Sequence, residues 1–325
     1  MDRRAFLGTL AGGLLAAPFA AETQQAGRVY RIGVVLQGGP YFADIDGLRD
    51  GLKELGLVEG RHFVLDLRDT KSDLSLVESA ARTLEEQKVD LIYSITTSVT
   101  LAAKRATKSV PIVFYTGTDP VAVGLVESFR KPGGRLTGVY GRFTELTAKR
   151  LELLKDMMPR LRRVVIFYSP DNPAAQISMR IARDAAGRLQ VKLVERPVDS
   201  VEALRAGLRA LRPGEADAFI YASDAMIVSQ EKLFLDTSRT KKLPTMLSYQ
   251  GNVSKGALAS YGENRFTLGR LAAQYIQRVL LGANPADLPI EQIDKLHFVV
   301  NLKTAKALGL TIPPSVLARA DEVVQ

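Results

Sequence analysis

Small hydrogen-bonding side chains follow nearly every apolar segment of this chain that has the pattern of a strand. Their hydroxyl, amide and carboxylate groups belong to Gln37, Thr96, Thr97, Ser98, Thr116, Asp119, Ser169, Asn172 and Asp224. Groups of this kind hold a small polar molecule by hydrogen bonds and by charge. The chemistry that they predict is recognition of a solute.

Four tyrosines add a second feature at the same places. Tyr115, Tyr168, Tyr221 and Tyr249 lie at or just beyond the ends of expected strands. A tyrosine offers a flat apolar face together with a hydroxyl group, which suits an aromatic or otherwise planar ligand. Each of them could equally seal the end of a sheet, so both interpretations stay open.

Three of these polar positions have structural alternatives. Asp119 precedes Pro120, and this pair is a good helix start, so helix capping is favoured over ligand binding there. No apolar helix pattern directly follows Asp224, so pairing with a ligand amine or hydroxyl is as well supported as capping. Residues 96–98 carry more hydroxyls than one helix cap needs, and a ligand carboxylate could rest on the helix N-terminus that they begin.

Side-chain groupings that catalyse reactions are missing. The only histidines, His62 and His297, fall in expected strands, and the chain has no cysteine. Residues 229–232 match Ser-x-x-Lys, but no Lys-Thr-Gly follows. No Gly-x-Gly-x-x-Gly follows the first strand, and no phosphate-binding loop is present. We therefore expect a protein that is not an enzyme and that has no metal and no cofactor.

Apolar strands alternate with amphipathic helices in two series. The first has expected strands at 30–36, 62–68, 90–94, 111–115 and 136–140 and helices at 41–55, 75–87, 99–107 and 121–129. The second has strands at 163–168, 192–196 and 218–221 and helices at 145–158, 174–189, 201–211 and 229–240. A helix at 265–281 and a strand at 298–301 follow. This alternation predicts an α/β fold with two doubly wound parallel-sheet lobes.

The strand ends explain where the polar residues fall. In an open parallel sheet, ligands bind beyond the carboxyl ends of the strands, where loops converge and helix N-termini point inward. The opposite ends carry ordinary charged turns, such as Arg61, Lys88 and Lys192. The sequence therefore predicts two lobes that face each other across a shared cleft.

The first 26 residues have the pattern of an export signal. Arg3 and Arg4 precede an apolar run over residues 5–17, and small residues follow. The paired arginines are similar to a twin-arginine signal, although Asp2 precedes them. The run is shorter than the roughly 20 apolar residues that span a bilayer, so no stable membrane insertion is expected. Without a cysteine for a lipid anchor, we expect the mature protein in the periplasm.

The formal net charge of +9 raises the question of nucleic acid. Lysine and arginine are scattered along the chain rather than gathered in one run with interleaved aromatic residues. A solvated basic surface is therefore favoured, and no nucleic-acid partner is expected.

Four longer segments resemble one protein family. They are residues 110–126 (V-P-I-V-F-Y-T-G-T-D-P-V-A-V-G-L-V), 131–138 (K-P-G-G-R-L-T-G), 268–288 (L-G-R-L-A-A-Q-Y-I-Q-R-V-L-L-G-A-N-P-A-D-L) and 300–314 (V-N-L-K-T-A-K-A-L-G-L-T-I-P-P). In them the chain is similar to the tryptophan/tyrosine branch of ABC-transporter substrate-binding proteins, which have the type I periplasmic-binding-protein fold. The resemblance covers nearly all of the chain after residue 26.

That resemblance implies a chain that crosses three times between its lobes, near Gly141, near residues 262–265 and near Leu288. The first lobe would comprise residues 27–141 and 265–287, and the second residues 142–264 and 288–325. The implied function is to bind a small solute by hinge closure and to present it to the permease and ATPase of an importer, with the protein acting as a monomer. An aromatic or branched amino acid or an aromatic carboxylate is the expected ligand.

Three other functions compete with this one. The first is a sensory protein that docks on a receptor, which the sequence does not separate from an importer component. The second is a transcriptional regulator on the same fold, but the residues before Tyr30 leave no room for a DNA-binding domain. The third is an enzyme on the same scaffold, which the missing bases and nucleophiles oppose.

Overall fold

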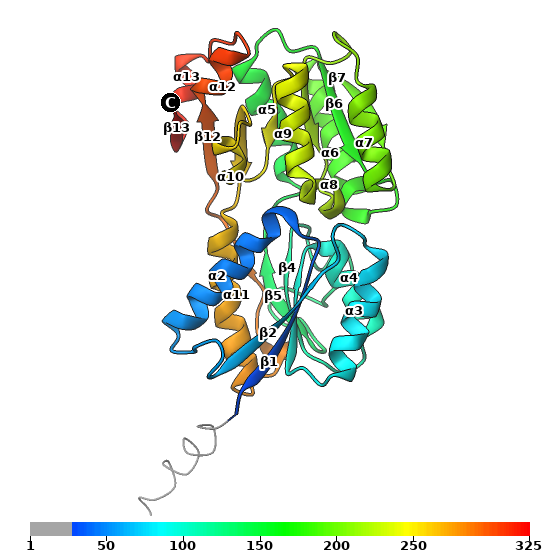
Figure 1. Ribbon diagram of the computed structural model, residues 1–325, viewed down its shortest axis with the longest axis vertical. Coiled ribbons are helices and arrows are strands. Elements are labelled where there is room, and N and C mark those ends of the chain that lie inside the picture. Colours follow the sequence, from blue (N-terminus) through cyan, green and yellow to red (C-terminus); the bar gives the residue numbers. More distant parts are fainter. Residues whose placement is uncertain (1–27) are drawn as a thin grey trace, which may run out of the picture.

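The computed structural model describes residues 28–325, which form two α/β lobes stacked along the long axis of the molecule (Figure 1). The expected export signal in residues 1–26 lies outside the described residues. Among residues 28–325, no helix combines the length and apolar character that a membrane crossing requires.

The first lobe is built on six parallel strands in the order β11-β5-β4-β3-β1-β2. These are β1 (Tyr30–Leu36), β2 (Phe63–Asp69), β3 (Leu91–Ile95), β4 (Ile112–Thr116), β5 (Leu136–Tyr140) and β11 (Glu291–Gln292). Every residue of β3, β4 and β5 is buried. Apolar, β-branched strands of this kind form the centre of a parallel sheet that helices cover on both faces.

Helices flank this sheet on both sides (Figure 1). They are η1 (Gly39–Tyr41), α2 (Phe42–Glu54), α3 (Ser75–Glu86), α4 (Thr97–Ala106), α11 (Arg265–Leu280) and η2 (Pro285–Asp287). α2 and α11 pack at very close range, because a Cβ atom at Gly269 would overlap the carbonyl oxygen of Asp44 and one at Gly47 would overlap that of Phe266. This close packing brings Asp44 beside Arg265, the first residue of α11.

The second lobe contains two sheets. β6 (Arg163–Tyr168), β7 (Lys192–Pro197) and β8 (Ala218–Tyr221) are parallel in the order β7-β6-β8. β9 (Met246–Leu247), β10 (Ala259–Gly262), β12 (His297–Asn301) and β13 (Glu322–Val324) lie in the order β13-β12-β10-β9. A bridge between Phe219 and Thr245 links the two sheets.

The helices of the second lobe are α5 (Leu146–Met157), α6 (Pro173–Leu189), α7 (Val201–Ala210), α8 (Ala225–Ser229), α9 (Glu231–Lys241), α10 (Gly251–Ser254), α12 (Leu302–Ala307) and α13 (Pro314–Leu317). The predicted α/β class with doubly wound parallel lobes is confirmed. One pair departs from it, because β12 runs antiparallel to β10.

The chain passes between the lobes after β5, between β10 and α11, and between β11 and β12. The third crossing was expected near Leu288, which is several residues before the position that the structure shows. β11 still pairs with β5 in the sheet of the first lobe, so the chain leaves that lobe only after Gln292.

One helix prediction is wrong and another is incomplete. Residues 121–129 form turns rather than a helix. The backbone of Gly124 has a φ of 70°, which the right-handed helix excludes, and it ends the segment after one turn. The helix expected at 229–240 is α9 (Glu231–Lys241), and a short helix that was not predicted, α8, precedes it and begins directly after Asp224.

The helix contact that positions Arg265 is testable by adding one methyl group. We expect Gly269→Ala to destabilise the fold by about 1–3 kcal/mol, because the new Cβ forces α2 and α11 apart. Gly187→Ala, in an open stretch of α6 where a Cβ meets nothing within 4 Å, is the matched control. It should be neutral or stabilise by up to about 1 kcal/mol. Urea unfolding of both variants checks this, and equal effects would show that the helix contact is not tight.

Candidate functional site

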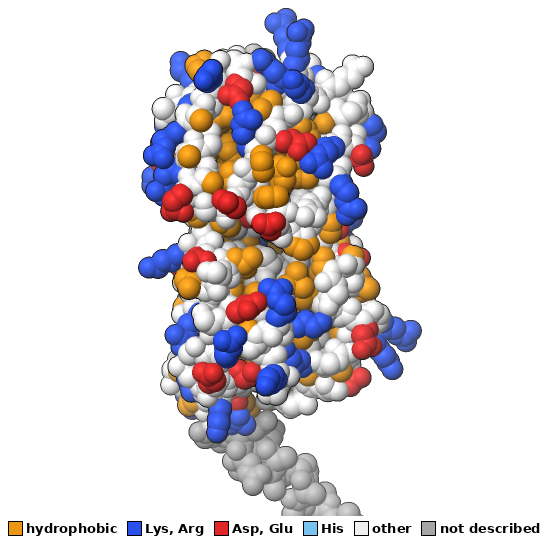
Figure 2. All heavy atoms as spheres, turned by 90° about the vertical axis from the view of Figure 1, so that its right-hand side faces the viewer, with side chains coloured by type: hydrophobic (Ala, Val, Ile, Leu, Met, Phe, Trp, Pro, Cys, Tyr) orange, Lys and Arg blue, Asp and Glu red, His pale blue; other side chains and the backbone are white. Residues whose placement is uncertain are grey.

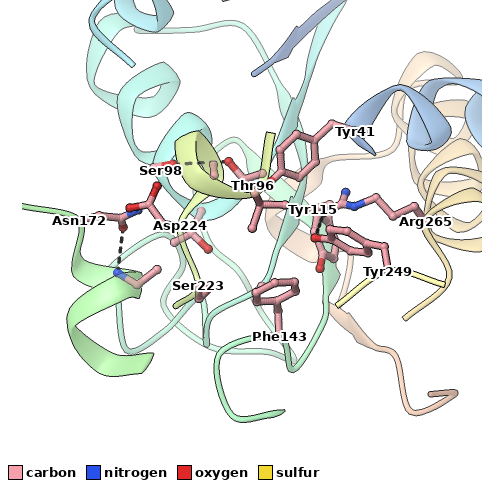
Figure 3. A pocket seen from close by; sticks show the side chains of 15 residues that line it. Tyr41, Thr96, Ser98, Tyr115, Phe143, Asn172, Ser223, Asp224, Tyr249 and Arg265 are labelled. Carbon is pink, nitrogen blue, oxygen red and sulfur yellow. Dashed lines mark hydrogen bonds between the residues drawn. The ribbon is translucent and has the colours of Figure 1, made fainter. Parts of the chain in front are cut away.

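A cavity lies where the two lobes meet, at the carboxyl ends of their strands. It contains about 320 Å³ of space not filled by protein atoms, part of which is open to solvent. Its lining comes from both lobes and comprises Tyr41, Thr96, Thr97, Ser98, Tyr115, Gly117, Phe143, Asn172, Ala174, Ser223, Asp224, Ala225, Val228, Tyr249 and Arg265 (Figure 3). The lining is aromatic at one end and polar at the other.

The first polar element of the cavity is the N-terminus of α4. Thr96 precedes it with a φ of 97°, and no side chain caps the helix. The hydroxyl of Thr97 is engaged by that of Thr116 at 2.7 Å, and the hydroxyl of Thr100 donates to the carbonyl of Thr96 at 2.8 Å. The threonine side chains therefore brace the loop, while the uncapped N–H groups at the helix start favour an anion.

Asp224 is the acidic group of the cavity and it also caps α8. Its Oδ1 accepts the backbone N–H of Ile227 at 3.1 Å, and its Oδ2 accepts the side-chain amide of Asn172 at 3.0 Å. Burial raises the pKa of this carboxyl above its ordinary value, although these hydrogen bonds oppose the shift. Capping, one of the two roles that the sequence left open for Asp224, is therefore observed, and the five-residue α8 is too short to show the apolar period that would have indicated a helix.

Arg265 forms the opposite end of the cavity. Its side chain is only 4% exposed, and its Nη1 donates to Oδ2 of the fully buried Asp44 at 2.6 Å. Its Nη2 donates to the hydroxyl of Tyr249 at 2.7 Å. The guanidinium carbon lies 4.2 Å, 4.4 Å and 4.9 Å from the ring centres of Tyr41, Tyr249 and Tyr115, distances at which a cation is attracted to an aromatic ring.

Burial shifts the pKa values of Asp44 and Arg265 in opposite directions. Burial raises the pKa of Asp44 from 3.8 to about 6, more than Arg265 lowers it. Burial alone would lower the pKa of Arg265, but Asp44 and the neighbouring tyrosine hydroxyls outweigh that effect and raise it. The guanidinium therefore stays charged, and Asp44 is the group that titrates.

Arg150 connects the crossings between the lobes behind the cavity. Its Nε donates to the carbonyl of Tyr261 at 2.8 Å and its Nη1 to that of Phe143 at 2.9 Å. Its guanidinium also lies 4.3 Å from the ring centre of Phe143. Burial raises the pKa of the adjacent Glu263 carboxyl, and the positive charge of Arg150 opposes this rise. The first and second crossings are thus held together by one buried side chain.

Seven of the predicted residues line this cavity, namely Thr96, Thr97, Ser98, Tyr115, Asn172, Asp224 and Tyr249. Gln37 and Ser169 line an adjoining groove between the lobes that shares Ser98, Asn172 and Asp224 with it. Thr116 does not line the cavity, but its hydroxyl is hydrogen-bonded to that of Thr97, which does.

Three predicted residues lie away from the cavity. The side chain of Asp119 accepts the N–H groups of Val121 and Ala122 in a turn. Tyr168 packs against the core of the second lobe. The hydroxyl of Tyr221 pairs with that of Ser248 at 2.8 Å, and its ring lies 5.5 Å from that of Phe234. Tyr168 and Tyr221 therefore follow the alternative in which a tyrosine seals the end of a sheet.

Sequence reasoning missed Tyr41, Phe143, Ser223 and Arg265. Ser223 stands beside Asp224 at the end of β8 and follows the same strand-end rule, so it was within reach. Tyr41 ends η1 after β1, Phe143 lies in the turn after β5, and both look like ordinary apolar residues. Arg265 begins a helix after a crossing, and no local pattern separates it from a surface arginine.

Comparisons with known proteins agree on one family. The model of the family described as "ABC transporter substrate binding protein" matches residues 31–324. A tyrosine-binding protein of Clostridioides difficile (strain R20291) is 30% identical over 264 residues, 81% of this chain and 76% of that protein.

Two solved structures of similar identity differ in how well they superpose. A Streptococcus pneumonia protein, solved as an ABC domain in complex with L-Trp, is 27% identical with a TM-score of 0.81, over 91% of this chain and 100% of that one. A substrate binding protein with adhesive properties from Clostridium difficile, solved ligand-free and open, is 28% identical with a TM-score of 0.62, over 91% of this chain and 99% of that one.

The raised pKa of Asp44 predicts a pH dependence of stability. Between its ordinary value of 3.8 and about 6, the folded protein binds this proton more readily than the unfolded chain does. The stability that Asp44 contributes is therefore present at low pH and is lost as the pH rises through about 6. From about pH 7.5 down to about pH 5, the free energy of unfolding should rise by about 1 kcal/mol in wild type relative to Asp44→Asn. Urea titrations at both pH values check this, and a difference that stays constant or reverses would contradict it.

Proposed function

The chain belongs to the family of ABC transporter substrate-binding proteins, and we propose that it binds an aromatic amino acid between its lobes for uptake by an importer. The observation that carries this proposal is the cavity itself, which joins an acidic group and an uncapped helix N-terminus at one end to an aromatic cluster at the other. A tyrosine-binding relative and a neighbour complexed with L-Trp support the same ligand class.

The proposed ligand lies with its amino acid head at the polar end. Its ammonium group pairs with the carboxylate of Asp224, and its carboxylate accepts from the N–H groups at the start of α4. Its ring packs among Tyr41, Tyr115 and Phe143. Each charge of the zwitterion then meets its complement, while the ring leaves water.

We propose that binding closes the lobes about the hinge formed by the three crossings. Contacts across the cleft support a closed arrangement: the hydroxyls of Ser72 and Ser229 are 2.5 Å apart, and Gln230 donates to Ser72 at 2.7 Å. The TM-scores agree, because the L-Trp complex superposes far better than the open, ligand-free neighbour of nearly equal identity. Ligand contacts to both lobes exist only in the closed state, so the ligand shifts the equilibrium toward closure.

The remaining proposals follow from the family. The protein acts in the periplasm after export by residues 1–26, releases its solute to a permease that an ATPase drives, and carries out no turnover. Lysine and arginine are interspersed with aspartate and glutamate over the face seen in Figure 2, which supports a solvated surface rather than a nucleic-acid site.

The role of Asp224 is tested by removing its charge while keeping its cap. Asp224→Asn retains a good N-cap, so α8 should persist. Affinity for L-tyrosine or L-tryptophan should fall about 10- to 100-fold by calorimetry, because a charge-assisted bond to the ammonium is lost. Affinity for 3-(4-hydroxyphenyl)propionate, which lacks the amine, should change little.

Asp119→Asn is the matched control, since Asp119 accepts backbone N–H groups in the same way but lies away from the cavity. It should leave every affinity unchanged. An Asp224→Asn protein that binds both amino acids as tightly as wild type would contradict the amine assignment.

Closure is tested at Gly39, where a Cβ would overlap the carbonyl oxygen of Ser229 in the opposite lobe. Gly39→Ala should weaken amino acid binding by at least about 10-fold, because the closed state then costs more than about 1.4 kcal/mol extra. Gly56→Ala is the control for backbone strain, since Gly56 also has a positive φ of 82° but open space around it. It should lower stability by about 1 kcal/mol and leave affinity unchanged. Equal affinities in the two variants would refute closure at this contact.

A further inference from the structure

Arg265 has more hydrogen-bond donors than its protein partners use. A guanidinium carries five N–H groups. One bonds to Asp44 and one to Tyr249, and Nε has no partner among residues 28–325 although it is shielded from water. A buried donor without a partner is unfavourable. A ligand atom that accepts a hydrogen bond from the Arg265 guanidinium would remove this cost and so add to the affinity.

The position of Arg265 decides which part of a ligand it can reach. Figure 3 shows Arg265 with Tyr41, Tyr115 and Tyr249 at one end of the cavity and Asp224 with Asn172 at the other. An amino acid carries its ammonium and carboxylate on a single carbon atom. If Asp224 binds the ammonium, the head of the ligand lies at the far end and the tip of its side chain points to Arg265.

The three aromatic amino acids differ in the hydrogen bonds that their rings can make with a guanidinium. A guanidinium donates and never accepts. The phenol oxygen of tyrosine accepts a hydrogen bond, and its own O–H can donate one to the hydroxyl of a neighbouring tyrosine. The indole N–H of tryptophan is a donor only, and the ring of phenylalanine offers no polar group.

We propose that Arg265 is the specificity-determining residue of this cavity and that it selects L-tyrosine over L-phenylalanine and L-tryptophan by donating to the ring hydroxyl; this rests on the function proposed above. Asp44 acts as a positioning residue, because its carboxylate fixes the guanidinium from the first lobe. Tyr249 contacts the same guanidinium from the second lobe, so the group of residues that binds the ring hydroxyl of the ligand is complete only when the lobes close.

The experiment measures the affinities of the purified chain for L-tyrosine, L-phenylalanine and L-tryptophan by calorimetry. Wild type should bind L-tyrosine about 10- to 100-fold more tightly than either of the others, as expected for a hydrogen bond to a charged donor. The test variant is Asp44→Leu/Arg265→Met, because removing Arg265 alone leaves a buried, unpaired Asp44 that could prevent folding. In it the preference should shrink to less than about threefold, mainly through weaker binding of L-tyrosine.

Arg270→Met is the matched control, since Arg270 lies on the same helix in a half-exposed ion pair with Asp50. It should keep the wild-type preference. A tyrosine preference that survives in the double variant, or an equal loss of affinity for all three ligands, overturns the proposal; the second result would place the ligand carboxylate at Arg265. If wild type binds none of the three, the function itself is wrong, whereas equal binding of all three by wild type overturns only the role of Arg265.

Discussion

The burial of the Arg265 guanidinium between two lobes is the constraint on which the rest of the site depends. A charge that is removed from water must be paired, and Asp44 provides the pair only because Gly47 and Gly269 let α2 and α11 pack backbone to backbone. Tyr41, Tyr115 and Tyr249 then surround the cation with ring faces. Since Tyr249 comes from the other lobe, the same group links the helix packing of the first lobe to the contact between the two lobes.

The two ends of the cavity differ in chemical character because of this arrangement. Arg265 and the tyrosines form one end, and Asp224, Asn172 and the uncapped α4 form the other. One cluster of buried apolar residues runs through both lobes and includes Tyr41, Tyr115, Phe143 and Tyr249. The contact between the lobes is therefore held by packing as well as by hydrogen bonds, and Arg150 joins the first two crossings behind it.

Much of the fold and part of the site follow from sequence patterns, for physical reasons that particular residues illustrate. Strand ends in a parallel sheet converge, so residues 96–98 and Asp224 could be assigned to one cleft from periodicity alone. Asp44 and Arg265 could not, because they are 221 positions apart and only the glycine-mediated helix contact brings them together. The helix predicted at residues 121–129 is absent although Asp119 accepts a backbone N–H group as a helix cap does, because Gly124 has a positive φ and ends the turn.

A crystal structure of the chain grown with L-tyrosine tests the central claim most directly. The account predicts one molecule of tyrosine between closed lobes, with its amino group on Asp224, its carboxylate at the start of α4 and its ring hydroxyl on Arg265. A cavity without the amino acid at saturating concentration would contradict the account. So would a tyrosine turned end for end, with its carboxylate on Arg265.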